Sequence, residues 1–221
     1  MSGDGILRVF LACYFGYVAV HYTATLLALR MRTGSSRAQL GEPRSRNAVH
    51  QRIFRLFRAV ILLVCVIRVP FPQVDAALLP FPYPGEAVGR WLGFAIMIFG
   101  LGLVDFAHAY LGPDWRSGLA GGPPRRLVTG GPYAASRNPI FAGILLGQAG
   151  FFLVLPSAFT LLCLVVGVTV ILRQVALEEE ALKRQFGPAY DDYRATTPRW
   201  IALRRHASRS DAHPGDPSAA L

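Results

Sequence analysis

The chain has 221 residues, of which 52% are hydrophobic and only 16% are charged, and its mean hydropathy is +0.36. Soluble domains carry about a quarter charged residues, so this chain has too few charges to cover a water-exposed surface. Its net charge of +10 does not indicate nucleic-acid binding, because the arginines lie in short loops beside long apolar runs, where they set membrane topology. The composition therefore indicates a polytopic membrane protein.

Five apolar runs predict five transmembrane helices in an all-α fold, with four as the alternative count. The runs cover about residues 6–29, 53–67, 88–111, 139–155 and 157–177. The second run is the least regular, because several prolines follow it. Only Pro156 and Ser157 separate the last two runs, which are therefore expected to form a tight helical hairpin that need not cross the whole bilayer.

The arginines also predict the orientation of the chain. Residues 30–58 hold eight arginines and one acid, and the loop that ends at Arg137 is similarly basic. The positive-inside rule places both loops in the cytoplasm, with the N-terminus outside and the C-terminus inside. The first run has no basic start and no small-residue cleavage site, so we expect a retained span.

Three regions are expected along the chain. Residues 1–87 form an N-terminal membrane region with two spans and a basic cytoplasmic loop, residues 88–201 form a membrane core, and residues 202–221 form a disordered tail. Beyond the fifth span, Leu177 to Phe186 predicts an amphipathic cytoplasmic helix that ends at Gly187-Pro188. A short helix around residues 189–195 follows, with two tyrosines on one face.

The loop and helix start between residues 127 and 143 are the most informative segment. Polar backbone at a membrane boundary is tolerated where it meets protein or a polar ligand. The Arg137 guanidinium can hold a carboxylate or phosphate, and the alternative is a snorkelling interfacial side chain. Asn138-Pro139 predicts a helix N-terminus, which either favours an anion or simply begins the helix. Gly143 and Gly147 have the spacing of close helix packing.

A second polar cluster, Glu178 to Glu180, follows the fifth span on the same side of the membrane. A helix spreads three adjacent carboxylates over about 200°, so they cannot all serve one ligand. One that faces the bundle would accept hydrogen bonds from an ammonium or a ribose diol, and a solvated helix start is the alternative. Arg173 is an ionisable group within an apolar run. Asp105 and His108 share a helix face and form either an internal pair or part of the same cavity.

These blocks together resemble the isoprenylcysteine carboxyl methyltransferase family, whose relatives include the phospholipid N-methyltransferases. The resemblance covers about residues 88–201 and rests on Leu127-Val128-Thr129-Gly130-Gly131-Pro132-Tyr133, Arg137-Asn138-Pro139-Ile140-Phe141-Ala142-Gly143, Glu178-Glu179, Phe186-Gly187 and Tyr190 to Tyr193. Members of this family are integral membrane enzymes that use S-adenosylmethionine. The resemblance therefore implies a methyltransferase with that cofactor.

The resemblance and the residue chemistry together nominate a set of site residues. The expected cofactor-binding residues are Leu127, Val128, Tyr133, Arg137, Asn138, Pro139, Phe141, Glu178 and Glu179, and the expected catalytic residues are Arg173 and Glu178. Arg173 lies one residue out of register with the family arginine. The family prefers His at position 138 and Tyr at position 141. Asn138 cannot act as a base near neutral pH and Phe141 has no hydroxyl, so the acceptor atom is left open.

The leading hypothesis is a membrane methyltransferase that takes S-adenosylmethionine from the cytoplasm and acts on a hydrophobic or amphipathic, lipid-like acceptor. Methyl transfer from a sulfonium mainly needs alignment and does not require a strong base. The alternative is a membrane protein that reuses the fold, such as a reductase-like relative or a non-catalytic subunit. A transporter is less favoured because the chain has no repeat. No metal partner is expected, since the three cysteines lack metal-binding spacing.

Overall fold

The computed structural model describes residues 3–33, 46–112 and 126–200. Helices dominate this part of the chain, and it contains no strand beyond a single isolated bridge between Pro80 and Ser157. The helices are α1 (Gly3–Thr33), α2 (Arg46–Ile67), α3 (Val74–Ala77), α4 (Glu86–Leu111), α5 (Pro132–Ala135), α6 (Pro139–Val154), α7 (Ala158–Phe186) and α8 (Pro188–Thr196). The predicted all-α class is confirmed.

Among the described residues, three helices are long and apolar enough to cross a membrane, namely Gly3–Thr25 of α1, the whole of α4 and the whole of α7. The 16 residues of α6 rise only about 24 Å, which is less than the roughly 30 Å hydrocarbon core. The helix α2 is not among these three candidates. Several apolar helices fit a multi-pass membrane protein, while the count of five spans stays a prediction.

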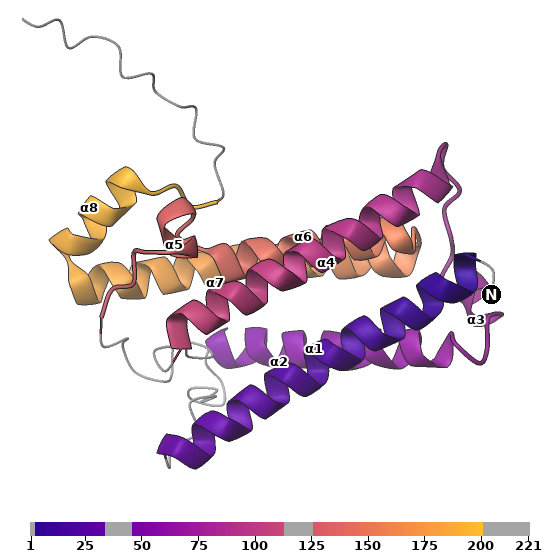
Figure 1. The fold of residues 1–221 in the computed structure, drawn as a ribbon, viewed down its shortest axis with the longest axis horizontal. Helices are drawn as coiled ribbons and strands as arrows, with labels where there is room; N and C mark the ends of the chain where they lie inside the picture. The colour runs from indigo at the N-terminus through magenta and orange to yellow at the C-terminus, as the bar shows by residue number, and fades with distance from the viewer. Residues whose placement is uncertain (1–2, 34–45, 113–125, 201–221) are drawn as a thin grey trace, which may run out of the picture.

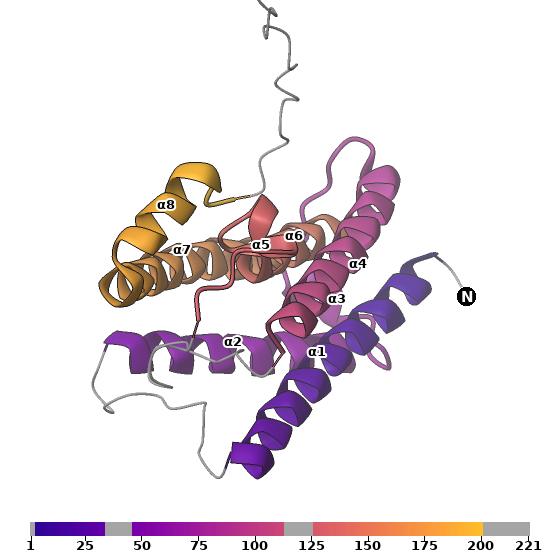
Figure 2. The same cartoon turned by 60° about the vertical axis from the view of Figure 1, so that its left-hand side comes forward.

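The long helices form two layers (Figures 1 and 2). One layer consists of α1 and α2, and the other consists of α4, α6 and α7. The helices α1, α4 and α7 end, and α2 and α6 begin, at the end of the bundle that carries α5 and α8. The described residues that flank the loops assigned to the cytoplasm by charge bias therefore share one end of the molecule, which we call the α5/α8 end. Which side of the membrane this end faces stays a prediction.

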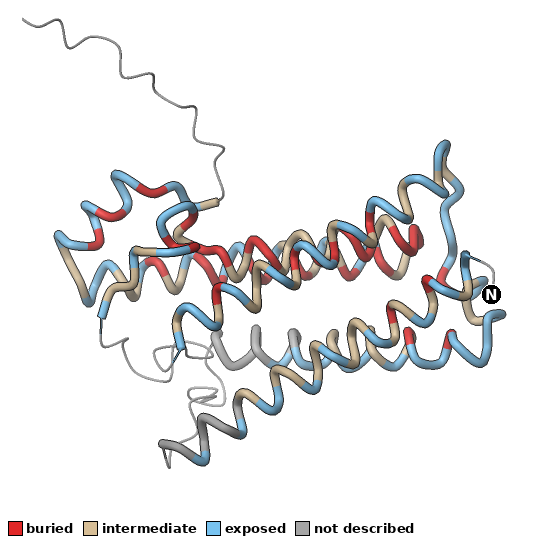
Figure 3. The backbone as a smooth tube through the Cα atoms, in the orientation of Figure 1, coloured by how far each residue is buried: buried red, intermediate tan, exposed pale blue. Residues whose placement is uncertain are grey.

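Most buried positions lie on α4, α6 and α7 (Figure 3), and the hydrophobic core cluster also includes Leu7 and Leu11 of α1 and Cys65 of α2. Two pairs of glycines bring the backbones of α4 and α6 into direct contact. A Cβ atom added to Gly100 or to Gly143 would lie 2.6 Å from the carbonyl oxygen of the other residue. The pair Gly93 and Gly150 has the same relationship, at 2.7 and 2.6 Å. The close packing predicted from the spacing of Gly143 and Gly147 is confirmed at Gly143, whereas a Cβ atom at Gly147 would meet the hydroxyl of Tyr14 on α1. The glycine pairs pack α4 closely against α6.

A short turn joins α6 to α7, and the two helices run in opposite directions (Figure 1). Ser157 forms a capping box with Thr160 at the start of α7. The segment after α3 holds this turn, because Phe81 donates a backbone hydrogen bond of 2.9 Å to the Pro156 carbonyl. The capping box and the segment after α3 thus both anchor the turn by hydrogen bonds.

The helix α7 continues without a break beyond the predicted fifth span as far as Phe186. The expected amphipathic stretch is therefore the last part of α7 and not a separate element. The short helix expected next is α8, and it buries both Tyr190 and Tyr193. The expected disordered tail, 202–221, lies outside the described residues.

Candidate functional site

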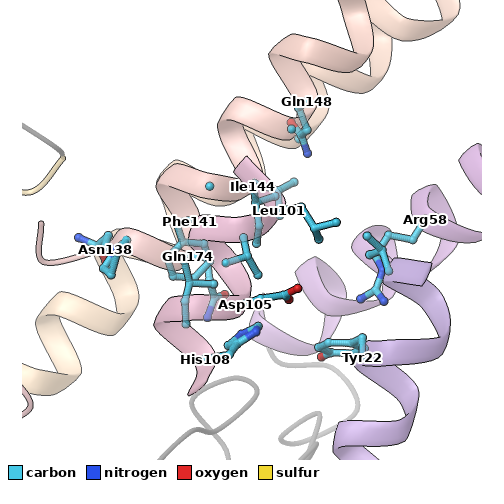
Figure 4. A pocket seen from close by; sticks show the side chains of 18 of the residues that line it. Tyr22, Arg58, Leu101, Asp105, His108, Asn138, Phe141, Ile144, Gln148 and Gln174 are labelled. Atoms are coloured by element: carbon cyan, nitrogen blue, oxygen red, sulfur yellow. The ribbon is translucent and has the colours of Figure 1, made fainter. Parts of the chain in front are cut away.

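A cavity of about 520 Å³ lies between the two layers of helices (Figure 4). Its size falls within the range of about 300–1,000 Å³ that is usual for small-molecule sites. Residues of α1, α2, α4, α5, α6, α7 and α8 line it, together with the segments on either side of α5. Of the predicted site residues, the cavity is lined by Leu127, Val128, Tyr133, Arg137, Asn138, Pro139, Phe141 and Glu178. Glu179 and Arg173 are not among the lining residues.

The loop before α5 brings Tyr133 into the cavity. Gly131 has a φ of +57°, and a Cβ atom there would lie 2.4 Å from the Tyr110 ring, so this position requires glycine. The Tyr133 carbonyl accepts a 2.6 Å hydrogen bond from the hydroxyl of Tyr193 on α8. Burial raises the pKa of Tyr133, and its hydroxyl has no hydrogen-bond partner among the described residues. A neutral, unpartnered phenol is thus available to a ligand.

Asn138 begins α6, as predicted, but its side chain does not cap the helix. Its Nδ2 atom donates to Glu179 Oε1 at 3.0 Å and to the Arg199 carbonyl at 3.3 Å. Because Pro139 has no N–H, the first amides of α6 belong to Ile140 and Phe141, which both line the cavity. The positive end of the α6 dipole therefore lies at the cavity without a side-chain cap from Asn138.

Arg137 and Glu179, both predicted as ligand groups, bind each other. The Nη2 atom of Arg137 lies 3.2 Å from Glu179 Oε1, and Arg199 Nη2 lies 2.7 Å from Glu179 Oε2. Arg137 also donates from Nη1 to the Thr197 carbonyl at 2.6 Å. The Glu179 carboxylate is 9% exposed and receives hydrogen bonds from two arginines and one asparagine. Because Glu179 does not line the cavity, its predicted role in binding the cofactor is not supported by the cavity.

The three adjacent glutamates face three directions, as the helical spread predicts. Glu178 lines the cavity, and its Oε1 atom accepts a 2.8 Å hydrogen bond from Gln174. Glu179 faces the arginines, and Glu180 is exposed and pairs with Arg184 at 2.5 Å. Arg173 is exposed on α7, so the structure does not bring it together with Glu178.

A second polar cluster at the cavity includes side chains of the N-terminal region. Tyr17 donates a 2.8 Å hydrogen bond to Asp105 Oδ2, and His21 Nε2 lies 3.7 Å from Asp105 Oδ1. Figure 4 shows Asp105 and His108 facing Tyr22 and Arg58 across the cavity. The sequence placed Asp105 and His108 at this end of a helix but gave no signal for their partners on α1 and α2.

The fold and the cavity define a multi-pass membrane protein with a ligand-sized site that is polar at two places and apolar between them. Residues 88–189 match the family model described as phospholipid methyltransferase. This segment is a little under half of the 221 residues, and its match confirms the resemblance that the motifs predicted. Comparisons with the curated proteins and with the solved structures gave no match.

Proposed function

We propose that the protein is an S-adenosylmethionine-dependent membrane methyltransferase that acts on a hydrophobic or amphipathic acceptor at the α5/α8 end, and that this end faces the cytoplasm. One observation carries the proposal. The family segment contributes Tyr133, the start of α6 and Glu178 to a single cavity of suitable size. These three groups are separated in sequence, and the fold brings them to the same wall.

The residues at this wall fit the chemistry of the cofactor. An ammonium or a ribose diol would find an acceptor in the Glu178 carboxylate, and a carboxylate would be favoured at the start of α6. Leu127 and Val128 offer apolar contact beside the unpartnered Tyr133 hydroxyl. When bound, S-adenosylmethionine supplies an electrophilic methyl group. The protein's own residues would bind and orient it and keep water away.

The remaining wall suits a lipid-like acceptor. Leu101, Phe141 and Ile144 make the middle of the cavity apolar (Figure 4), and Asp105 provides a carboxylate at its other polar place. Asp105 Oδ1 has no hydrogen-bond partner among the described residues. It can therefore accept a hydrogen bond or a proton from the reacting group of the acceptor. Alignment of the two reactants in one cavity is the main contribution that such a site makes to methyl transfer.

Calorimetric titration of the purified protein with S-adenosylmethionine and S-adenosylhomocysteine tests the proposal. We expect saturable binding of both. No binding of either compound at millimolar concentration would overturn it. Binding without transfer of labelled methyl groups to any extractable lipid or small molecule of the native membrane would favour the alternative, a non-catalytic subunit that reuses the fold.

A further inference from the structure

We propose that the segment Thr197 to Arg199, which we call the C-terminal strap, holds the cofactor end of the cavity in place, with Arg199 as a positioning residue. The strap follows α8 and lies outside residues 88–189, the segment that the family match covers. The effect on cofactor binding rests on the proposed function. The effect on the structure of residues 133–141 does not rest on it.

The backbone of the strap satisfies the polar groups of the turn that leads into α6. The Arg137 amide donates to the Pro198 carbonyl at 2.9 Å. The Ser136 hydroxyl donates to the Arg199 carbonyl at 3.0 Å, across 63 positions of sequence. The Asn138 side chain donates to the same carbonyl at 3.3 Å. Ser136 and Asn138 are buried, so without the strap their polar atoms would lose partners that water does not readily replace.

The Arg199 side chain ties the strap to α7. Its Nη2 atom donates to Glu179 Oε2 at 2.7 Å, and its Nε atom donates to Glu179 Oε1 at 3.2 Å. The same Oε1 atom accepts from Asn138 Nδ2 at 3.0 Å and from Arg137 Nε at 3.2 Å. Glu179 therefore joins α7, the start of α6 and the strap in one charge-assisted network.

Neither Arg199 nor Glu179 lines the cavity, whereas Asn138, Arg137 and Tyr133 do. A second contact reinforces this arrangement, because Tyr193, just before the strap, donates to the Tyr133 carbonyl. The strap thus acts on the cofactor only through the residues that it holds. Loss of the Arg199 guanidinium should loosen residues 133–141 and weaken cofactor binding, while the contact between α4 and α6 stays intact.

Three variants of the full chain test this inference, namely Arg199→Ala, Arg199→Lys and the control Arg184→Ala. The control removes an arginine–glutamate pair on α7, between Arg184 and Glu180. This pair is exposed and makes no contact with the strap. We measure the Kd of S-adenosylhomocysteine and, without ligand, hydrogen–deuterium exchange of peptides covering residues 133–141 and 143–150.

For Arg199→Ala we expect a rise in Kd of about tenfold or more, as for the loss of one hydrogen bond to a charged group, and faster exchange in 133–141 but not in 143–150. For Arg199→Lys, the Kd and the exchange rate should lie between those of Arg199→Ala and the wild type. For Arg184→Ala, both should match the wild type. Unchanged exchange in 133–141, or equally faster exchange in both peptides, would overturn the proposal that the strap holds residues 133–141 in place. If the wild type binds no S-adenosylhomocysteine, the proposed function fails, and the exchange comparison still decides the strap.

Discussion

Tyr17 on α1 donates a 2.8 Å hydrogen bond to Asp105 on α4, although 88 positions of sequence separate the two residues. The bond joins the N-terminal region to the segment that matches the phospholipid methyltransferase family model. Both residues line the cavity. The layer formed by α1 and α2 therefore completes a wall of the candidate site, in addition to any role in anchoring the protein in the membrane.

The first prediction concerns Asp105. We expect Asp105→Asn to lower methyl transfer about 10²-fold, the lower end of the range for removing a group that accepts a proton. Binding of S-adenosylhomocysteine should change less than about twofold, because Asp105 is not among the groups proposed to hold the cofactor. Transfer of labelled methyl groups into a membrane lipid extract measures the first quantity and calorimetry the second. Equal transfer by the variant and the wild type would remove Asp105 from the acceptor site.

The second prediction separates the three glutamates. Glu178→Gln should raise the Kd of S-adenosylhomocysteine roughly 10- to 100-fold, since a hydrogen bond to a charged group contributes about 1.5–3 kcal/mol. Glu180→Gln is the matched control and should leave the Kd unchanged, because Glu180 pairs with Arg184 at the exposed face of α7. Calorimetric titration of both variants decides the matter. A similar Kd for the two variants would count against Glu178 as a cofactor ligand.

The third prediction concerns the contact between α4 and α6. Gly100→Ala places a Cβ atom 2.6 Å from the Gly143 carbonyl oxygen, and relief of such overpacking typically costs about 1–3 kcal/mol. We expect a lower thermal unfolding midpoint in detergent. Gly102→Ala is the control on the same helix, since a Cβ atom at Gly102 meets nothing within 4 Å. A loss of stability in Gly102→Ala as large as in Gly100→Ala would show that backbone contact is not the cause.

The fourth prediction concerns the end of the bundle opposite α5 and α8. Asp75 lies 2.8 Å from Arg8 Nη2 and 2.5 Å from Arg68 Nε. Burial raises the pKa of Asp75, but the hydrogen bonds and charges of Arg68 and Arg8 outweigh burial and hold that pKa below its ordinary value of 3.8. The carboxylate therefore stabilises the fold above pH 3.8, and this stabilisation is lost as the pH falls through the lower folded-state pKa.

Asp75→Asn should accordingly lower the thermal midpoint at neutral pH, and the difference from the wild type should shrink in strong acid. Asp191→Asn serves as the control, since Asp191 forms an exposed pair with Lys183 at 3.2 Å, and such pairs contribute little. Thermal unfolding at neutral pH and below pH 3.8 provides the comparison. A gap between Asp75→Asn and the wild type that does not depend on pH would contradict the assignment of the pKa.

Local features of the sequence predicted much of the fold. The apolar run 139–155 corresponds to α6, and Asn138-Pro139 marks its start, because proline at the first helical position is a local preference. The third run corresponds to α4, and Gly187-Pro188 marks the boundary between α7 and α8. The division of α7 near residue 177 was wrong, because a change from apolar to amphipathic pattern does not interrupt the backbone hydrogen bonds of a helix.

The sequence by itself determined the all-helical membrane class and the resemblance of residues 88–189 to the phospholipid methyltransferases. It also nominated the segments that could bind a cofactor, because composition, run length and short motifs are local properties. Only the tertiary structure decided which charges meet. The sequence suggested Arg137 and Glu179 as ligand groups, but in the structure they form an ion pair with each other. Glu179 also pairs with Arg199. Asp105 finds Tyr17 on another layer. Such pairings depend on how helices far apart in sequence pack together, and local periodicity does not contain that information.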